Sequence, residues 1–481
     1  MGRKAGSAPL VLLAADRIRC ARDQPTESEV PSCHRDVEAI AGRPDDVDRS
    51  QDIEVLAMKM QRHLPPTAAP LALLDLVKGA LGLVCAGSFQ RTLESEIKTF
   101  FNVRHVFLLT SGKAALTTIL RGLKADSSRR QVIIPAYTCF SVPSAVLKAG
   151  LDVVLCDVDP HTLDFDLQRL RETVGPDTLA IVAPHLLGQP ADIPAIRGIA
   201  KPMGAFIIED AAQAMGCKSE GRWLGTQGDI GFFSVGRGKN LSAGSGGVIV
   251  TNSDRLAESV RREFARLSFE PIMAIIGNFL KVVVATFLIH PKLYWIPAGI
   301  PFLGLGETKF YPDFPVCRMD GIRVGLLSSW RGRLDESNRC RVQTRRSFLD
   351  RLSLVAERLL VHPSEAVLNL RLPVLMPSAQ QKEALCAADK LNGLGISGLY
   401  PAPISKISDI ASMFGSRRYP GAEVLSARLV TLPLHRFVTE TDVDRICAVV
   451  GQYVEESGAT PAHDRRSHED NLHRKVFPSA R

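Results

Sequence analysis

The sequence has few of the features that mark metal-binding, secreted or repetitive proteins. Its ten cysteines are scattered and form no C-x-x-C pair, which argues against a zinc site and against a disulfide framework. The short apolar stretch 10–15 runs directly into Asp16 and Arg17, so it makes a poor signal peptide. We find no internal repeat. We therefore expect a cytoplasmic protein that holds no metal.

A nucleic-acid-binding motif is also missing, although the formal net charge is +8. The densest basic cluster, 341–346, is mixed with other residues in a stretch that is predicted to be helical. Such a cluster is more typical of a solvated helix face than of a nucleic-acid site. A basic surface could equally attract an anionic substrate or an anionic membrane.

The composition of the chain is that of a globular protein with polar ends. Apolar residues make up 45% of the 481 residues, which is enough for a large core. Residues 1–62 are rich in charged residues and proline, and we predict a disordered extension; translation from Met58 or Met60 is the alternative. The polar stretch 456–481 carries three histidines among charged residues, and we predict a disordered tail there.

Short apolar strands alternate with helices in the first part of the chain. The predicted strands are 132–135, 152–157, 179–184, 205–209, 230–235 and 247–251. This alternation predicts an α/β fold with a mainly parallel sheet that is covered on both faces. Ligands of such sheets bind beyond the carboxyl ends of the strands, so the residues that follow each strand are candidates for the site.

The pattern divides the chain into a large domain, 63–330, and a smaller α/β domain, 331–455. In the smaller domain, a strand is predicted at 370–376. Pro373 would confine that strand to the edge of its sheet, because proline cannot donate a ladder hydrogen bond. The large domain contains an apolar insertion at 271–306.

A turn of small residues follows a predicted strand at Ser111, Gly112 and Lys113, and a helix begins there. Backbone N–H groups at such a helix start can bind an anion such as phosphate, and the helix dipole assists them. In isolation, the same turn is more often an ordinary helix cap.

Two residues at other strand ends are candidates for catalysis. Asp210 follows an apolar strand, where its carboxylate can face a ligand or simply cap a helix. Lys239 lies in a glycine-rich turn between two buried strands, an unusual place for a residue that prefers solvent. A lysine in such a place suits a Schiff-base nucleophile, whose amine is tuned by burial. Ser234 could hydrogen bond to a phosphate, and His185 follows another strand.

These segments occur in a specific order: Ser-Gly-x-Ala-Ala-Leu, Pro-x-x-Thr, Asp-Val-Asp, His-Leu-x-Gly, Glu-Asp-Ala-Ala-Gln-Ala, Ser-x-x-x-x-Lys-Asn and Gly-Gly-x-x-Val-Thr. The order closely resembles that of the DegT/DnrJ/StrS-type sugar aminotransferases over residues 65 to 455. The resemblance implies the type I fold of pyridoxal phosphate (PLP) enzymes, with a seven-stranded sheet. It also implies a homodimer with shared active sites.

The resemblance implies roles for individual residues. Lys239 would hold PLP as a Schiff base and then shuttle a proton, and Asp210 would pair with the pyridine nitrogen. Gln213 would contact the oxygen side of the ring, and Ser234 with the Ser111–Gly112 turn would hold the phosphate. Further cofactor contacts are expected from Lys113, Tyr137, His185 and Asn240. The implied reaction moves an amino group from an amino acid, by family resemblance glutamate, to a keto-sugar that is nucleotide-linked, in polysaccharide or glycolipid synthesis.

The sequence departs from the family pattern at three places. Cys139 stands where relatives carry an aromatic residue that stacks on the cofactor, so either Tyr137 or Phe140 could stack instead, and we favour Tyr137. Ser245 replaces a glutamate, and the segment after Tyr400 lacks the usual leucine and histidine. The last two departures concern the acceptor side of the site.

Two questions stay open in the sequence. In the insertion 271–306, the apolar run 272–289 has a borderline length for a membrane span, and a span would place the two halves of one active site on opposite sides of a bilayer. An interfacial helix and a buried packing or dimer element are the two equal alternatives. The reaction also has alternatives. Family dehydratases carry histidine in place of Lys239, so lysine favours transamination. Two other hypotheses are a transaminase that acts on a non-sugar ketone and a non-catalytic, membrane-associated PLP-binding scaffold.

Overall fold

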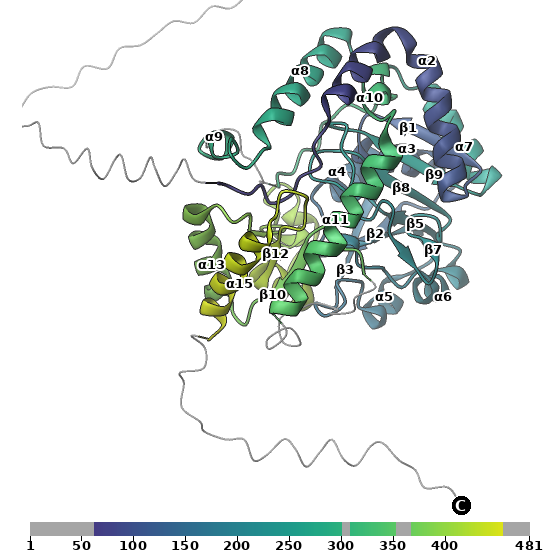
Figure 1. Cartoon of the computed structure of the whole chain (residues 1–481). Helices are drawn as coiled ribbons and strands as arrows, with labels where there is room; N and C mark the ends of the chain where they lie inside the picture. Colours follow the sequence, from purple (N-terminus) through teal and green to yellow (C-terminus); the bar gives the residue numbers. More distant parts are fainter. Residues whose placement is uncertain (1–61, 301–307, 353–366, 456–481) are drawn as a thin grey trace, which may run out of the picture. The chain divides into compact units, whose positions relative to one another are not determined.

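The computed structural model describes residues 62–300, 308–352 and 367–455 (Figure 1). Most of the predicted extension 1–62 and the predicted tail 456–481 lie outside these ranges. All described residues belong to one compact unit of the chain.

A seven-stranded sheet forms the centre of the large domain. Its strand order is β1-β9-β8-β5-β4-β2-β3. Strand β9 runs antiparallel to both of its neighbours, and the pairs β8–β5, β5–β4, β4–β2 and β2–β3 are parallel. The strands are β1 His105–Leu109, β2 Gln131–Pro135, β3 Asp152–Cys156, β4 Thr178–Pro184, β5 Phe206–Asp210, β8 Ile230–Ser234 and β9 Gly247–Thr251. The mainly parallel seven-stranded sheet is therefore confirmed.

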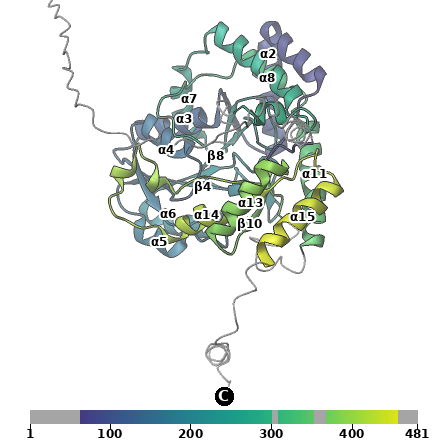
Figure 2. The ribbon, with the colours of Figure 1, turned by 90° about the vertical axis from the view of Figure 1, so that its left-hand side faces the viewer.

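Helices cover both faces of this sheet (Figures 1 and 2), because nearly every strand residue is apolar and buried. One core cluster joins the sheet to α3 Gly112–Ala125, α4 Ser141–Lys148 and α7 Asp254–Ala265. Two clusters on the opposite face join it to the remaining helices of the large domain. These helices are α2 Leu73–Phe101, α5 Leu167–Thr173, α6 Ile193–Met203, α10 Gly321–Leu326 and the start of α11 Trp330–Arg351. The hairpin strands β6 Lys218–Ser219 and β7 Arg222–Trp223 lie at the edge of this core.

A three-stranded sheet with the order β10-β12-β11 forms the second core. Strand β10 pairs with β12 alone, which confirms the edge position that Pro373 predicts. Ser378 caps α13 by accepting a hydrogen bond from the backbone N–H of Gln381. The elements are β10 Leu372–Leu375, α13 Ala379–Asn392, β11 Ser397–Gly398, α14 Pro420–Arg428, β12 Leu429–Leu432 and α15 Glu440–Glu455.

The first long helix, α2, packs backbone to backbone against α10. A Cβ atom at Gly82 would lie 1.9 Å from the carbonyl oxygen of Gly321, so only glycine allows this approach. The predicted insertion 271–306 forms α8 Ile272–Leu288, which packs against α2, and the short helix α9 Trp295–Ala298; residues 301–306 lie outside the described ranges.

Candidate active site

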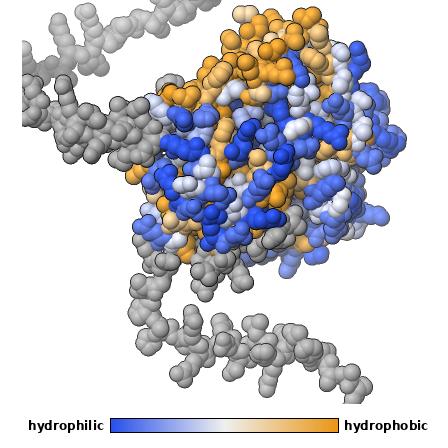
Figure 3. Space-filling view, in the orientation of Figure 1, coloured by the Kyte–Doolittle hydropathy of each residue, from blue (hydrophilic) through white to orange (hydrophobic). Residues whose placement is uncertain are grey.

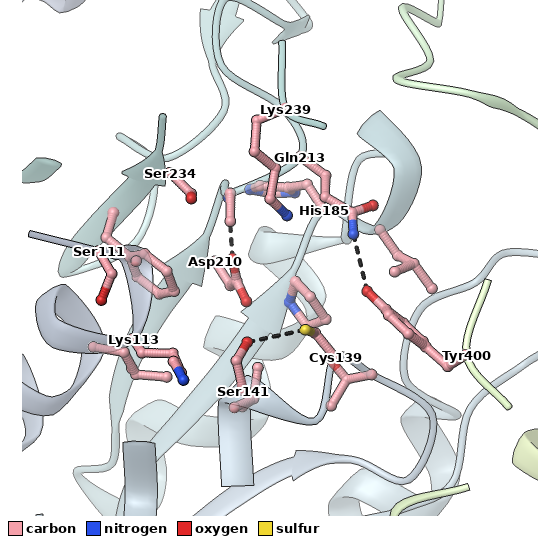
Figure 4. A pocket seen from close by; sticks show the side chains of 18 residues that line it. Ser111, Lys113, Cys139, Ser141, His185, Asp210, Gln213, Ser234, Lys239 and Tyr400 are labelled. Carbon is pink, nitrogen blue, oxygen red and sulfur yellow. Dashed lines mark hydrogen bonds between the residues drawn. The ribbon is translucent and has the colours of Figure 1, made fainter. Parts of the chain in front are cut away.

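A cavity of about 220 Å³ opens at the carboxyl ends of the parallel strands, where such sheets bind ligands (Figure 4). Eight of the ten predicted site residues line it, and they come from five separate stretches of chain. These residues are Ser111, Gly112, Lys113, His185, Asp210, Gln213, Ser234 and Lys239. The other lining residues include Thr138, Cys139, Ser141, Phe232 and Tyr400.

One end of the cavity is built to receive an anion. Ser111 is the N-cap of α3, and its Oγ accepts a hydrogen bond from the backbone N–H of Ala114 over 3.0 Å. The first N–H groups of the helix have no partner within it, and they carry the positive end of the helix dipole. Gly112 lets Ser234 come close, since a Cβ atom at Gly112 would lie 3.3 Å from Ser234 Oγ. This end therefore offers backbone and hydroxyl donors to a phosphate.

Asp210 lies at the end of β5 as a buried carboxylate. Its Oδ1 accepts a hydrogen bond from the backbone N–H of Ala212 over 3.0 Å. Burial raises the pKa of this carboxyl, and the Ala212 hydrogen bond and the charge of Lys239 oppose that rise. A positively charged partner inside the cavity would favour the ionised form.

Lys239 projects into the same cavity as Asp210 (Figure 4). The turn that carries it needs glycine, because Gly238 has a φ of 76°. The guanidinium of Arg341 donates to the carbonyl oxygen of Lys239 over 3.5 Å and to that of Leu370 over 3.3 Å. Arg341 is fully buried, and burial lowers its pKa to about 10. The backbone that aims the lysine is thus fixed by helix α11.

A second lysine shares the cavity. Lys113 is half-buried in the first turn of α3, and its Nζ lies 4.4 Å from the centroid of the Phe314 ring. Burial lowers the pKa of this amine. An amine with a lowered pKa is more readily deprotonated, so geometry leaves two candidate nucleophiles in one cavity.

His185 is held in one orientation by two buried hydrogen bonds. Its Nδ1 accepts from the backbone N–H of Ala191 over 3.1 Å, so its Nε2 donates to Glu209 Oε2, 2.8 Å away. Burial alone would raise the pKa of Glu209. Hydrogen bonds from His185, Gly228 and Gly225 outweigh that effect and lower it. The result is an immobile, flat ring on the cavity wall.

Tyr400 enters the cavity from the segment after β11, and the site prediction did not include it. Gln213 Nε2 donates to the Tyr400 hydroxyl over 2.9 Å, and Gln213 Oε1 accepts from the backbone N–H of Leu187 over 2.8 Å. The only sequence signal for Tyr400 is its position beside Pro401 in a segment that departs from the family pattern.

Two predicted site residues do not line the cavity. Tyr137 is buried beneath it, where its hydroxyl accepts from the backbone N–H of Tyr400 over 3.2 Å and donates to the carbonyl oxygen of the same residue. Cys139 lines the cavity in its place, and its Sγ accepts a hydrogen bond from Ser141 Oγ at 2.9 Å. The structure thus places Cys139, and not Tyr137, at the cavity wall, and stacking by Tyr137 stays a prediction that this position does not support.

Asn240 also points away from the cavity. Its side chain is buried, and its Nδ2 donates to Asn338 Oδ1 on α11 over 3.1 Å. A residue that follows the candidate lysine was expected beside the ligand, but its side chain is directed toward α11 instead. Asn240 therefore anchors the turn and does not line the site.

A second cavity of about 260 Å³ lies beside the first, and Ser111 and Lys113 line both. Ser245, where relatives carry glutamate, accepts from Arg323 Nε over 2.8 Å. Glu270 lies 2.8 Å from the same guanidinium. A carboxylate is therefore still present at this side of the site, but it comes from a different segment of the chain.

The chain is similar to known proteins over part of its length. The chain is 37% identical over 176 residues to the "Pleiotropic regulatory protein" of Geobacillus stearothermophilus. It is 38% identical over 176 residues to the UDP-N-acetyl-3-dehydro-alpha-D-glucosamine 3-aminotransferase of Acidithiobacillus ferrooxidans. Each match covers 36% of this chain and 47% of the relative, so the matched part spans about half the length of these relatives.

The fold is shared with solved structures. Helicobacter pylori PseC, an aminotransferase involved in the biosynthesis of pseudoaminic acid, superposes with a TM-score of 0.65 at 17% identity, over 81% of this chain and 99% of that one. The sequence model of the DegT/DnrJ/EryC1/StrS aminotransferase family matches residues 75–271 and 316–451, which is more than half of the chain. The chain belongs to the DegT/DnrJ/EryC1/StrS aminotransferase family.

Proposed function

We propose that the protein is a PLP-dependent aminotransferase that moves an amino group from an amino acid, namely glutamate, to a nucleotide-linked keto-sugar. One observation carries the proposal: Lys239 and Asp210 face a single cavity that ends at the anion-binding start of α3. The names of relatives such as the 3-aminotransferase of Acidithiobacillus ferrooxidans support the substrate class.

The residues present fit the cofactor. PLP carries an anionic phosphate, an aldehyde and a basic ring nitrogen, and the cavity has a complementary group for each. The start of α3 with Ser234 suits the phosphate, a lysine amine suits the aldehyde, and the buried Asp210 suits a protonated ring nitrogen. The raised pKa of Asp210 means that this carboxylate gains from a buried cation beside it.

When bound, PLP supplies an electron sink for the carbon–nitrogen bonds that are made and broken. The side chains of the protein do the rest. Lys239 Nζ would hold the cofactor and would move a proton to and from the substrate carbon. Asp210 contributes a buried carboxylate to the cavity. The hydrogen bonds to Leu187 and Tyr400 hold the side-chain amide of Gln213 in one orientation at the cavity wall.

The residues of the site also bear on the alternatives to sugar transamination. A sugar dehydratase of this family would carry histidine at position 239, and lysine stands there. A non-sugar ketone as acceptor would use the same cavity, and a non-catalytic scaffold would need neither Lys239 nor Asp210. We propose a homodimer in which a second copy completes each site, as the family resemblance implies.

The proposal is tested with the full chain, PLP and glutamate. We expect a visible absorption band from bound PLP that glutamate removes as the amino group is transferred. Lys239→Ala should lack the lysine-dependent band, while Lys113→Ala, which changes the other lysine of the cavity, should keep it. A band that glutamate leaves unchanged would count against transamination with this donor, and no band in the wild type would count against PLP itself.

A further inference from the structure

Exposed apolar side chains gather on the first half of α2 and along α8 (Figure 3). Val84 is 87% exposed and Met273 is 76% exposed, values that are unusual for side chains of this type. We call this surface the apolar face and define it by six exposed residues: Leu73, Leu81, Val84, Met273, Leu280 and Phe287. A contiguous apolar surface on two helices marks an interaction site.

The two helices form one surface, since they lie side by side in both views (Figures 1 and 2). The ring of Phe279 on α8 packs over Gly79 on α2, where a Cβ atom would lie 3.2 Å from it. Val282 and Val283 of α8 pack against the same core cluster as Leu76 of α2. The inner sides of both helices are therefore fixed to the protein, and their outer sides are free to bind a partner.

The charge around this face has one sign. The stretches 76–93 and 271–306 contain no aspartate or glutamate. Asp75 is buried, where it accepts a hydrogen bond from the backbone N–H of Ala72. The exposed charged residues of the two stretches include Arg91, Lys281 and Lys292. A surface of this kind is complementary to an anionic lipid layer.

We propose that the apolar face docks the enzyme on an anionic phospholipid membrane, with α2 and α8 lying in the plane of the interface. Helix α8 has 17 residues, or roughly 25 Å at ~1.5 Å per residue, which is short of a span. Helix α2 is long and apolar enough to cross a membrane by composition. Its second half, however, is anchored in the core through Leu93, Ile97 and Phe101.

A second copy of the chain is a poorer occupant. A two-fold self-contact brings the same surface patch of both copies together, so Lys281 and Lys292 of both copies would lie in one interface with no carboxylate in either stretch to pair with them. Protein interfaces are also depleted of lysine, whereas interfacial membrane helices are flanked by it.

Docking would bring the lipid surface close to the active site. Helix α8 lies in the segment between the two parts matched by the family model. Its Asn278, Lys281 and Val282 line the second cavity, which shares Ser111 and Lys113 with the first. The α8 part of the apolar face is thus an addition to the family core, and it forms a wall beside the site.

The test is flotation of the full chain, loaded with PLP, on phosphatidylcholine vesicles with and without phosphatidylglycerol. We expect the wild type to float with the anionic vesicles and to be released by high salt. Met273→Glu combined with Phe287→Glu should lower the bound fraction at least about tenfold, because carboxylates replace side chains that enter lipid. Leu391→Glu, on the 82% exposed Leu391 of α13, is the matched control and should float like the wild type.

Three results would overturn the proposal: a wild type that stays with the soluble fraction, equal binding to neutral and anionic vesicles, or a double variant that floats unchanged. A wild type that does not float but becomes monomeric on the double substitution would assign the face to a second copy. Flotation needs no substrate, so its outcome is independent of whether amine transfer is observed.

Discussion

Gln213 donates a hydrogen bond of 2.9 Å to the hydroxyl of Tyr400, which joins the end of β5 to the segment after β11. The same amide accepts from the backbone N–H of Leu187 over 2.8 Å. Three strand ends of the chain are thus connected through one side chain at the cavity wall. The orientation of Gln213 therefore depends on a residue that follows the small sheet in the chain.

The first prediction concerns this bond. Tyr400→Phe leaves the Gln213 amide without its acceptor, so we expect the free energy of unfolding to fall by about 1 kcal/mol and kcat/KM to fall roughly tenfold. Urea unfolding and steady-state transfer from glutamate measure the two effects. Tyr453→Phe on α15 is the control. Full activity of Tyr400→Phe would show that catalysis does not depend on the orientation of Gln213 by the Tyr400 hydroxyl.

The second prediction separates charge from hydrogen bonding at Asp210. Asp210→Asn can keep the hydrogen bond from Ala212 but loses the negative charge. We expect kcat/KM to fall by roughly 10²-fold or more, because a protonated ring nitrogen is no longer favoured. The melting temperature should not fall, since the variant no longer buries a carboxylate. An Asp210→Asn enzyme with wild-type rates would refute the ring-nitrogen role.

The third prediction tests the contact between α2 and α10. Gly82→Ala places a Cβ atom 1.9 Å from the Gly321 carbonyl oxygen, so the helices must separate, and we expect a loss of about 2 kcal/mol or more in stability. Gly87→Ala in the same helix meets only the end of the Arg91 side chain, at 3.5 Å. Chemical denaturation should show that Gly87→Ala is harmless. Equal stability of the two variants would contradict the packing.

The fourth prediction concerns pH. His435 is fully buried, donates to the carbonyl oxygen of Pro65 and accepts from the backbone N–H of Phe437. Burial lowers its pKa to about 3, below the value of about 6.5 for an exposed histidine. The folded protein holds His435 in its neutral form. The contribution of His435 to the free energy of unfolding is therefore complete above about pH 6.5, and it is lost as the pH falls toward about 3.

His435→Gln cannot be protonated, and its melting temperature should therefore fall less between pH 7 and pH 5 than that of the wild type, whatever its starting stability. The difference in slope between the two curves is the measurement. Parallel curves would mean that His435 does not carry this part of the acid sensitivity.

The sheet and most of the site follow from local patterns. Runs such as 132–135 and 247–251 are apolar on both sides, so they predict buried strands. Both strands form, but β9 at 247–251 runs antiparallel to its two neighbours, which the apolar run alone does not predict. Asp210, Ser234 and Lys239 follow strands, and the topology gathers them because parallel strands end at the same edge of the sheet.

The residues that the sequence did not predict depend on distant partners. Tyr400 lies 187 positions after Gln213 in the sequence and yet contacts it. The periodicity of apolar residues within a helix or strand gives no information about such a distant contact. The orientation of Asn240 is set by Asn338 on α11. The first half of α2 exposes apolar side chains such as Leu73 and Val84, and the sequence alone does not identify what covers such a face.

We predict that Lys239, and not Lys113, holds the cofactor. Both lysines line the cavity, and Lys113 has the lowered pKa, so the two must be separated by chemistry. The full chain is incubated with PLP, reduced with borohydride and digested, and the modified peptide is identified by mass spectrometry. We predict that the cofactor mass is found on Lys239 alone and is absent if glutamate is added before reduction. Modification of Lys113, or of neither lysine, would contradict the account.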